Sequence, residues 1–330
     1  MAMVIRFHEA GGPEVLRREE MDVPGPGPEE VKMKVEALGL NRAEIAYREG
    51  RYLERPQFPS KLGYEAAGTV IGVGSEVRGV TKGERVGVIP NFSMAEYGTY
   101  GEEILVPSSS VTLCPDDVSS ATFAAVWMQY LTAYGGLVEI GGLKPGEYVL
   151  ITAASSSVGL AAIQIALALG AVPIATTRTY AKREALLQAG AAHVIATEEQ
   201  DLVAEVRKVT GNSGVRLIFD PIAGPGVEKL AKAAAAGGTI IIYGGLSAQA
   251  TPFPGGLAMV RGLALRGFTV FEITKDPSRL ARAKEFIYEG LANRTLRPLI
   301  DRSFRLEDIT EAHRYMEKNE QIGKIIVTVP

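Results

Sequence analysis

The chain has 330 residues, of which 46% are hydrophobic and 22% charged, the proportions of a globular protein large enough for two domains. Its formal net charge of −3 argues against a nucleic-acid partner, and no run of about 18 apolar residues is present to span a membrane. Arg6 interrupts the N-terminus before a signal-peptide core can form, so we expect a cytoplasmic protein.

The first third of the chain predicts an irregular, all-β unit. Pro24–Pro28 is a turn or linker run, and short apolar stretches are separated by Gly and Pro. The predicted strands are Glu30–Leu38, Ala66–Val73, Arg85–Ile89 and Glu103–Pro107. A short helix is suggested at Arg42–Arg48, directly after Asn41, a residue type that caps helix N-termini.

The run Tyr148–Gly159 has the outline of a nucleotide site. It predicts a buried strand, a turn of small residues and an apolar helix whose N-terminal amides can hold a phosphate. On the G-x-G-x-x-G spacing, Ala154 and Ser156 replace the first two glycines and only Gly159 is kept. The residues of this turn that we assign to the cofactor are Ala154, Ser155, Ser156, Ser157, Val158 and Gly159. An ordinary strand-to-helix connection of an α/β protein is the alternative interpretation.

The second strand of this unit favours NADP(H) over NAD(H). Val172–Thr177 ends without the carboxylate that holds a ribose 2′-hydroxyl and continues into Arg178 and Lys182. A carboxylate would repel a 2′-phosphate, whereas Arg178 can bind one bidentately and Lys182 can add a point charge. In the alternative, Lys182 and Arg183 only solvate the start of the helix Tyr180–Ala189, although cations at a helix N-terminus oppose its dipole.

Strands and helices alternate along the middle of the chain, which predicts a doubly wound parallel sheet of six strands. The strands are Tyr148–Thr152, Val172–Thr177, His193–Ile195, Arg216–Asp220, Thr239–Tyr243 and Leu265–Val270. The helices include Val158–Leu169, Tyr180–Ala189, Glu199–Val209 and Val227–Ala236. The fold class is therefore α/β.

The C-terminal region predicts helices Pro277–Glu289 and Leu306–Lys318 and a last strand, Lys324–Val329. Because a lone strand needs a sheet to pair with, we expect it to rejoin the first domain. We therefore expect a discontinuous domain of residues 1–122 and 268–330 around a Rossmann domain of residues 123–267.

Cysteine and histidine content disfavours metal chemistry. Cys114 is the single cysteine, so the chain has no internal disulfide and no multi-cysteine zinc site. His8, His193 and His313 are far apart in sequence and none has metal-ligand spacing; we interpret His193 and His313 as structural.

Several segments together resemble the medium-chain dehydrogenase/reductase superfamily over nearly the whole chain. They are Gly11–Leu16, Gly39–Glu44, Gly63–Val70, Leu131–Tyr134 and Gln321–Val327. The resemblance implies a GroES-like catalytic domain and a Rossmann domain.

Zinc-dependent alcohol dehydrogenases of that superfamily have a cysteine at the position of Asn41, a histidine at that of Tyr64 and a cysteine close to Met128. Asn, Tyr and Met do not form a credible zinc ligand set. The chain therefore resembles the zinc-free quinone oxidoreductase, or zeta-crystallin-like, branch. The resemblance implies NADPH-dependent reduction of a quinone or an α,β-unsaturated carbonyl, in which hydrogen-bond donors stabilise the delocalised charge.

The same resemblance suggests catalytic residues. Asn41 would orient the nicotinamide or the substrate carbonyl, or would only cap the helix that follows. Tyr52 would donate a hydrogen bond or a proton to the developing oxyanion, or would be a surface anchor. Tyr64 and Tyr47 compete with Tyr52 for this role.

Further cofactor contacts are implied at residues in several elements: Asn41, Thr132, Thr177, Tyr243, Gly244, Phe271 and Lys324. Lys324 is assigned to a cofactor phosphate, with an ordinary solvated lysine as the alternative. The resemblance also implies a homodimer through the edge strand Leu265–Phe271, whose unpaired edge would otherwise be a liability. Beside an active reductase, an NADPH-binding protein with little turnover and a zinc-dependent alcohol dehydrogenase remain alternatives, and the physiological substrate is not specified.

Overall fold

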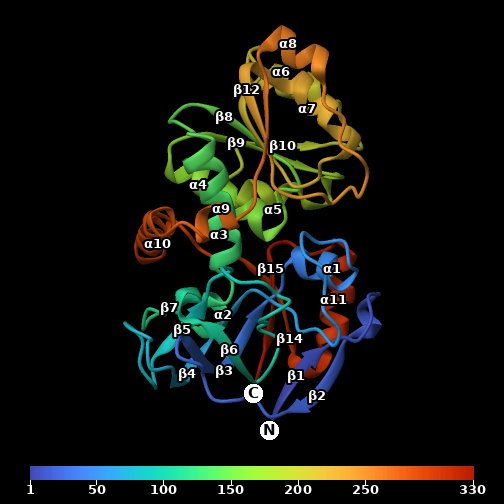
Figure 1. Ribbon diagram of the computed structural model, residues 1–330. Helices are drawn as coiled ribbons and strands as arrows, with labels where there is room; N and C mark the ends of the chain where they lie inside the picture. Colours follow the sequence, from blue (N-terminus) through green and yellow to red (C-terminus); the bar gives the residue numbers. More distant parts are fainter. The chain divides into compact units, whose positions relative to one another are not determined.

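The computed structural model describes residues 1–330, which divide into two compact units (Figure 1). Unit 1 comprises Met1–Met128 and Pro298–Pro330, and unit 2 comprises Gln129–Arg297. The boundaries therefore differ from the expected 122 and 268. The second boundary lies later because helix α10 (Pro277–Ala292) packs within unit 2, where Arg279 and Arg282 both form ion pairs with Glu139.

Unit 1 is built on a seven-stranded sheet, in which the strands follow the order β14-β15-β3-β4-β5-β7 and β6 also pairs with β3. Its strands are β3 (Glu30–Gly39), β4 (Ala66–Val73), β5 (Arg85–Val88), β6 (Glu103–Pro107), β7 (Val111–Leu113), β14 (Ile300–Arg305) and β15 (Lys324–Thr328). A separate antiparallel pair is formed by β1 (Ala2–Arg6) and β2 (Arg17–Met21). The helices of the unit are α1 (Arg42–Arg48), α2 (Ser120–Phe123) and α11 (Ile309–Glu317).

The C-terminal strand β15 returns to the N-terminal sheet, as expected. It pairs antiparallel with β3, where Ile326 lies opposite Gly39, and parallel with β14. The register brings the C-terminal Lys324 close to the end of β3 and to the residues that follow it. Gly39 makes this approach possible, because a Cβ there would lie 2.0 Å from the carbonyl oxygen of Ala124 and 2.8 Å from Cε of Lys324.

Unit 2 holds a parallel sheet of six strands in the order β10-β9-β8-β11-β12-β13, which confirms the α/β fold class. The strands are β8 (Tyr148–Ile151), β9 (Val172–Thr177), β10 (His193–Ala196), β11 (Val215–Asp220), β12 (Ala234–Ile242) and β13 (Ala264–Gly267). The helices are α4 (Ser157–Ala168), α5 (Arg183–Gln188), α6 (Leu202–Val209), α7 (Val227–Ala233), α8 (Gly255–Arg261), α9 (Phe271–Thr274) and α10. Helix α3 (Trp127–Tyr134) and a π-helical turn (Gly135–Ile140) precede β8.

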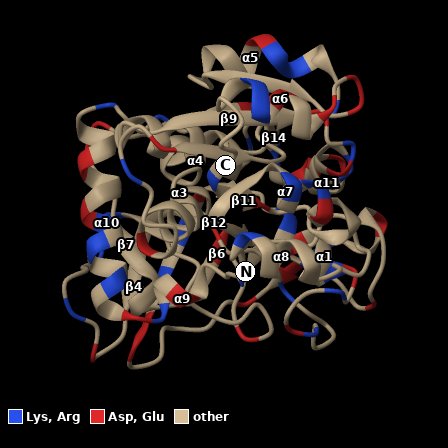
Figure 2. Ribbon diagram, turned by 90° about the horizontal axis from the view of Figure 1, so that it is seen from above, with Lys and Arg blue, Asp and Glu red and all other residues tan.

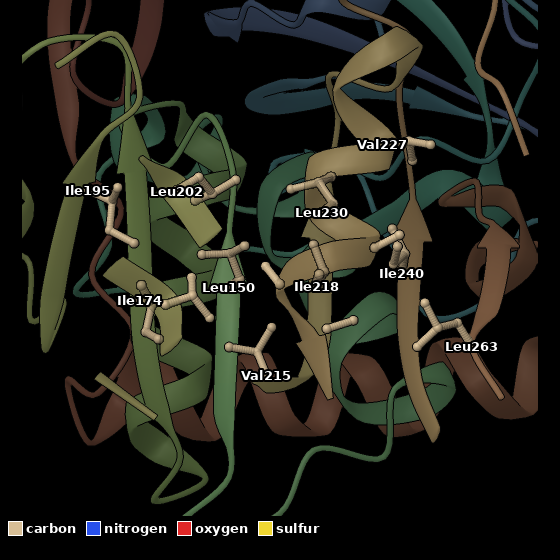
Figure 3. Packing of buried hydrophobic residues seen from close by; sticks show 14 of the residues in the cluster. Leu150, Ile174, Ile195, Leu202, Val215, Ile218, Val227, Leu230, Ile240 and Leu263 are labelled. Carbon is tan, nitrogen blue, oxygen red and sulfur yellow. The ribbon is translucent and has the colours of Figure 1, made fainter. Parts of the chain in front are cut away.

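Because the strand order grows outward from β8 in both directions, right-handed crossovers place α4 and α5 on one face of the sheet and α6 and α7 on the other. On the second face, Leu150, Ile174 and Ile218 from the strands meet side chains of α6 and α7 (Figure 3). Leu202 and Leu230 are the helix residues at the centre of this core. This core holds in place the carboxyl ends of β8 and β11, and the loops that follow these two strands are described below.

The sixth strand is shorter than expected. β13 ends at Gly267, and Val270 already has the helical conformation that begins α9 at Phe271. Phe268 turns inward instead of continuing the edge, and only 3% of its surface is exposed. The predicted edge strand Leu265–Val270 was therefore wrong in its second half, because burial of Phe268 overrides the β-propensity of the following residues.

Charged residues of both signs are interspersed on the surface helices. Figure 2 shows Lys or Arg beside Asp or Glu on α5 and α10, in agreement with the nearly balanced net charge of −3. None of the helices combines the length and the hydrophobicity that a membrane span requires.

Candidate active site

The turn between β8 and α4 has the geometry expected of a phosphate-binding turn. Ser156 is the N-cap of the twelve-residue helix α4, and its side chain accepts a hydrogen bond from the amide of Gly159 at 3.1 Å. A Cβ at Gly159 would lie 2.6 Å from the backbone of Ala154, so only glycine allows the helix to approach the strand this closely. The half-buried side chains of Ser155 and Ser157 remain beside the free N-terminal amides.

Two strained residues lie at the carboxyl ends of neighbouring strands of unit 2. Ala153 follows β8 with φ 46°, and Ala223 follows β11 with φ 58°. The buried carboxylate of Asp220 holds this region together, since it accepts hydrogen bonds from the hydroxyl of Thr152 and from the amides of Ile222 and Ala223. Positive φ angles at non-glycine residues occur preferentially at ligand sites, where the surrounding structure compensates the strain.

The cationic group predicted after β9 is present at the same edge. Lys182 Nζ lies 3.4 Å from Ser155 Oγ, so its charge adjoins the phosphate-binding turn. Arg178 directly follows Thr177, the last residue of β9, and is exposed with no ion-pair partner. The structure also brings in a carboxylate that the sequence did not indicate, because Glu199 Oε1 accepts a hydrogen bond from the amide of Tyr180 at 3.1 Å.

The four remaining predicted cofactor residues of unit 2 lie in or directly after three elements. Tyr243 and Gly244 follow the end of β12, where the ring of Tyr243 stacks on Phe219 with centroids 4.0 Å apart. Thr132 lies in α3, and Phe271 begins α9, four residues after the last residue of β13.

Unit 1 contains a buried charged cluster around Asn41, which is the N-cap of α1. The amide of Asn41 donates to Glu44 Oε2 at 2.7 Å, and its side-chain oxygen accepts from Lys324 Nζ at 2.7 Å. Lys324 also forms a fully buried ion pair with Glu65 at 2.5 Å, and the other Glu65 oxygen accepts from the amide of Met128 at 3.0 Å. The structure thus places the predicted phosphate contact Lys324 in an ion pair within unit 1.

A second arm of the cluster runs from Glu44 to Arg48 through Tyr100 and His313. The distances are 2.7 Å from Tyr100 Oη to Glu44, 3.1 Å from Tyr100 Oη to His313 Nε2, and 2.8 Å from His313 Nδ1 to Arg48. Arg48 can only donate, so Nδ1 of His313 accepts and Nε2 carries the proton. Tyr100 therefore accepts from His313 and donates to Glu44.

His313 makes the folded state sensitive to acid. Burial, with the nearby Arg48 charge, lowers the pKa of His313 to about 3 from an ordinary value of 6.5. Between pH 6.5 and pH 3, His313 therefore binds a proton in the unfolded chain but not in the folded one. The free energy of unfolding consequently falls as the pH drops below 6.5. At about 1.4 kcal/mol per pH unit, we expect a loss of about 2 kcal/mol between pH 6.5 and pH 5.

The variant His313→Gln tests this prediction, because glutamine accepts and donates like neutral histidine without titrating in this range. Urea unfolding at pH 7 and pH 5 should show a smaller loss of stability in His313→Gln than in the wild type. An equal loss in both proteins would contradict the assignment to His313.

Three tyrosines compete as proton donor, and their surroundings distinguish them. The rings of Tyr47, Tyr52 and Tyr64 form a row, with centroid distances of 6.5 Å and 6.2 Å. Tyr47 and Tyr64 are fully buried, and the hydroxyl of Tyr47 is hydrogen-bonded to Ser60 at 2.9 Å. Tyr52 is only half-buried, so it is the one tyrosine of the three whose ring is accessible.

The hydroxyl of Tyr52 is supported by Tyr64 and Glu54. Burial raises the pKa of Tyr52 to about 12, while a hydrogen bond from Tyr64 lowers it. The Tyr64 hydroxyl has a single hydrogen, and its oxygen also lies 3.2 Å from Glu54 Oε1, so Tyr52 and Glu54 share this one donor. Glu54 in turn accepts from the amide of Met94 at 2.8 Å and from the hydroxyl of Ser93, which ties the loop that contains Ser93 and Met94 to Tyr64.

Sequence reasoning missed several members of the site, although some left a signal. Glu44 stands three residues after an N-capping Asn, which is the signature of a capping box, and it could have been found. Glu54, Tyr100, His313 and Asp220 are recognisable only from their contacts. No three His, Cys, Asp or Glu side chains in the chain lie together as a metal site would require.

Comparison with known proteins agrees with this division of the chain. The model of the alcohol dehydrogenase GroES-like domain matches residues 27–116, and that of the zinc-binding dehydrogenase matches residues 157–289. Human quinone oxidoreductase is 32% identical over 326 residues, which cover 98% of this chain and 96% of that protein.

Two further relatives extend the comparison. The 2-haloacrylate reductase of a Burkholderia species is 29% identical over 337 residues, with 99% of each chain covered. The crystal structure of Escherichia coli quinone oxidoreductase complexed with NADPH superimposes with a TM-score of 0.92 at 29% identity, again with 99% of each chain covered. The chain therefore belongs to the zeta-crystallin-like quinone oxidoreductase branch of the medium-chain dehydrogenase/reductase superfamily.

Proposed function

We propose that the protein is an NADPH-dependent oxidoreductase that transfers hydride to a quinone or an α,β-unsaturated carbonyl without a metal ion. The observation that carries the proposal is the hydroxyl pair Tyr52–Tyr64, which is backed by Glu54 and has a half-buried, accessible member. Relatives named quinone oxidoreductase and 2-haloacrylate reductase, and a structural neighbour complexed with NADPH, support the same class of reaction.

Unit 2 offers the groups that a phosphorylated dinucleotide needs. The amides at the N-terminus of α4 and the hydroxyls of Ser155 and Ser157 would hold the pyrophosphate. Arg178 and Lys182 would take the 2′-phosphate, since Lys182 already lies beside Ser155 and Arg178 has no ion-pair partner. The carboxylate of Glu199 accepts a hydrogen bond from the amide of Tyr180.

Unit 1 offers the groups that a conjugated acceptor needs. When bound, NADPH supplies a hydride, which adds two electrons to the acceptor and leaves a negative charge on its oxygen. Tyr52 donates its hydroxyl proton to that oxygen, and Tyr64 turns its own hydroxyl toward the resulting tyrosinate. Because conjugation delocalises the charge, hydrogen-bond donors suffice where a simple ketone would require a Lewis acid.

The experiment that tests this function is a panel of quinones and enones assayed with NADPH. We expect stoichiometric oxidation of NADPH with at least one conjugated acceptor and none with a saturated ketone or alcohol. Tight NADPH binding without turnover on any acceptor would instead indicate a binding protein. Turnover of simple alcohols that depends on added zinc would indicate an alcohol dehydrogenase.

We further propose that unit 2 forms a homodimer at the β13 edge. β13 pairs with β12 on one side only, and the neighbouring helix α8 exposes 83% of Met259 and 85% of Val260. An open strand edge beside exposed apolar side chains is a self-association surface.

Substituting both α8 residues by glutamate should convert the dimer to a monomer, because two charges would have to be desolvated in the interface. Light scattering coupled to gel filtration measures the mass directly. Leu167→Glu is the matched control, since Leu167 is an exposed leucine of α4 outside this surface. A dimer that withstands the double substitution would exclude this edge as the interface.

A further inference from the structure

A line of hydrogen-bonded groups leads from Tyr52 through Tyr64 to Glu54, all within unit 1. Its middle member, Tyr64, is completely buried, whereas Tyr52 and Glu54 at the two ends are half-buried. The ring centroids of the two tyrosines lie 6.2 Å apart, and Tyr64 Oη lies 3.2 Å from Glu54 Oε1. The buried hydroxyl of Tyr64 therefore joins two groups that are each partly exposed to solvent.

The carboxylate of Glu54 is held by hydrogen bonds and not by an ion pair. Its Oε1 atom accepts from the amide of Met94 at 2.8 Å, and its Oε2 atom accepts from the hydroxyl of Ser93. These two bonds fix the plane of the carboxylate with Oε1 toward Tyr64. A lysine or arginine in contact with the group would oppose its protonation, and no ion pair of the protein includes Glu54.

The single hydroxyl hydrogen of Tyr64 has two acceptors to choose between. While Tyr52 carries its own proton, the carboxylate of Glu54 holds this hydrogen, because a charged acceptor forms the stronger bond. Once Tyr52 has given its proton to the substrate, its oxygen is negative as well, and Tyr64 can turn its hydrogen to it. That turn opens the lone pair of Glu54 Oε1 that faces Tyr64, so that a proton can bind there.

The proposed reaction requires that Tyr52 recover its proton. Hydride addition to a quinone or an enone is completed by one proton, which the proposed function takes from Tyr52. The protein returns to its starting state only when this proton has been replaced from water. A substrate bound at the accessible hydroxyl of Tyr52 excludes water from it, whereas the contact between Tyr52 and Tyr64 is internal and stays in place.

We propose that Glu54 supplies the proton that restores Tyr52 in each turnover, by way of the Tyr64 hydroxyl. The O–H bond of Tyr64 breaks as that of Tyr52 forms, and the O–H bond of protonated Glu54 breaks as that of Tyr64 forms. A hydronium ion or a buffer acid then gives one proton to Glu54, and no electrons are exchanged in these steps. The inference rests on the proposed function and deepens it, because it names the source of the proton.

The first test follows hydride and proton separately in a single turnover of the protein with NADPH and a quinone. Stopped-flow absorbance records NADPH oxidation, and a pH-indicator dye in weakly buffered solution records proton uptake. In the wild type, uptake should follow oxidation without delay. In Glu54→Gln, oxidation should be at least as fast, because Tyr52 still holds its proton, but uptake should be roughly 10²-fold slower, as expected on loss of a positioned proton-transfer group. Equal uptake rates in the two proteins would overturn the proposal.

Glutamine suits this test because it keeps the hydrogen bonds of Glu54 but cannot carry the proton. Its amide oxygen can accept from Met94 and Tyr64, and its NH₂ group can donate to the hydroxyl oxygen of Ser93. Glu96→Gln is the matched control, since Glu96 is an exposed glutamate three residues after Ser93. Proton uptake in this control should keep the wild-type rate, and a delay there as well would contradict the role of Glu54.

The second test uses a small acid to bypass the relay, which a merely structural role of Glu54 would not allow. In Glu54→Gln, Tyr52 must recover its proton directly from the solution. Turnover in excess substrate should therefore rise with the concentration of imidazole buffer at fixed pH and ionic strength, whereas wild-type turnover should not depend on it. A slow Glu54→Gln protein that does not respond to imidazole would overturn the proposal.

Tyr64→Phe breaks the same relay without changing the carboxylate, so the test does not depend on the folding of one variant. It should show both the delayed proton uptake and the response to imidazole. Prompt uptake in Tyr64→Phe would contradict the proposed route. Absence of NADPH oxidation by the wild type with every quinone and enone would instead overturn the proposed function, so the two failures are distinguishable.

Discussion

Tyr52→Phe is expected to lower kcat for quinone or enone reduction by roughly 10²- to 10⁴-fold, the usual contribution of a positioned general acid. The phenylalanine ring keeps the contacts with Tyr47 and Tyr64, whose centroids lie 6.5 and 6.2 Å away, so packing is preserved while the hydroxyl is lost. The affinity for NADPH should be unchanged, because unit 2 supplies the phosphate contacts. Stopped-flow measurement of NADPH oxidation and calorimetric binding separate the two effects.

Two further variants make this test specific. Tyr64→Phe removes the hydroxyl that lowers the pKa of Tyr52, so a smaller loss of rate and an upward shift of that pKa are expected. Tyr47→Phe breaks only the hydrogen bond to Ser60 and should leave the rate near that of the wild type. A Tyr52→Phe protein with normal turnover, or a Tyr47→Phe protein with the large loss, would show that Tyr52 is not the donor.

The double variant Arg178→Ala/Lys182→Ala is expected to weaken NADPH binding by about 3 kcal/mol, or roughly 10²-fold. Both cations are assigned to the 2′-phosphate, which NADH lacks, so the affinity for NADH should change little. The preference for NADPH over NADH would then largely disappear. Dissociation constants for both cofactors, measured at one fixed salt concentration, provide the check.

Arg183→Ala is the matched control for this prediction, because it removes a neighbouring cation of the same segment that is not assigned to the phosphate. Its ratio of NADPH to NADH affinity should stay at the wild-type value. Equal weakening of both cofactors in the double variant would mean that Arg178 and Lys182 act on the common part of the dinucleotide.

Much of the fold was predictable because unit 2 follows strong local patterns. β9 (Val172–Thr177) matches its expected range in full, and α4 differs by one residue at each end, since apolar runs bounded by small residues define both. Other elements depend on tertiary contacts. α7 ends at Ala233 because Ala234 already pairs in the sheet, and α10 joins unit 2 through ion pairs with Glu139.

The candidate site was predictable where its residues are close in sequence and not where they are distant. The turn Ala154–Gly159 follows from spacing alone, and Asn41 is recognisable as a helix cap. The pairing of Arg48 with His313 joins positions 265 residues apart, and Lys324 meets Asn41 across 283. Such contacts arise because α11, which carries His313, and β15, which carries Lys324, both return to the N-terminal unit. The partners of Lys324 could therefore not be predicted from its own segment.

The central claim is that protein hydrogen-bond donors, and no metal ion, absorb the charge created by hydride transfer to a conjugated acceptor. The most direct measurement compares NADPH-dependent quinone reduction before and after exhaustive chelation, with the metal content determined by elemental analysis. We predict unchanged turnover in a protein that contains no stoichiometric metal. Loss of turnover on chelation, with recovery on addition of zinc, would contradict the account.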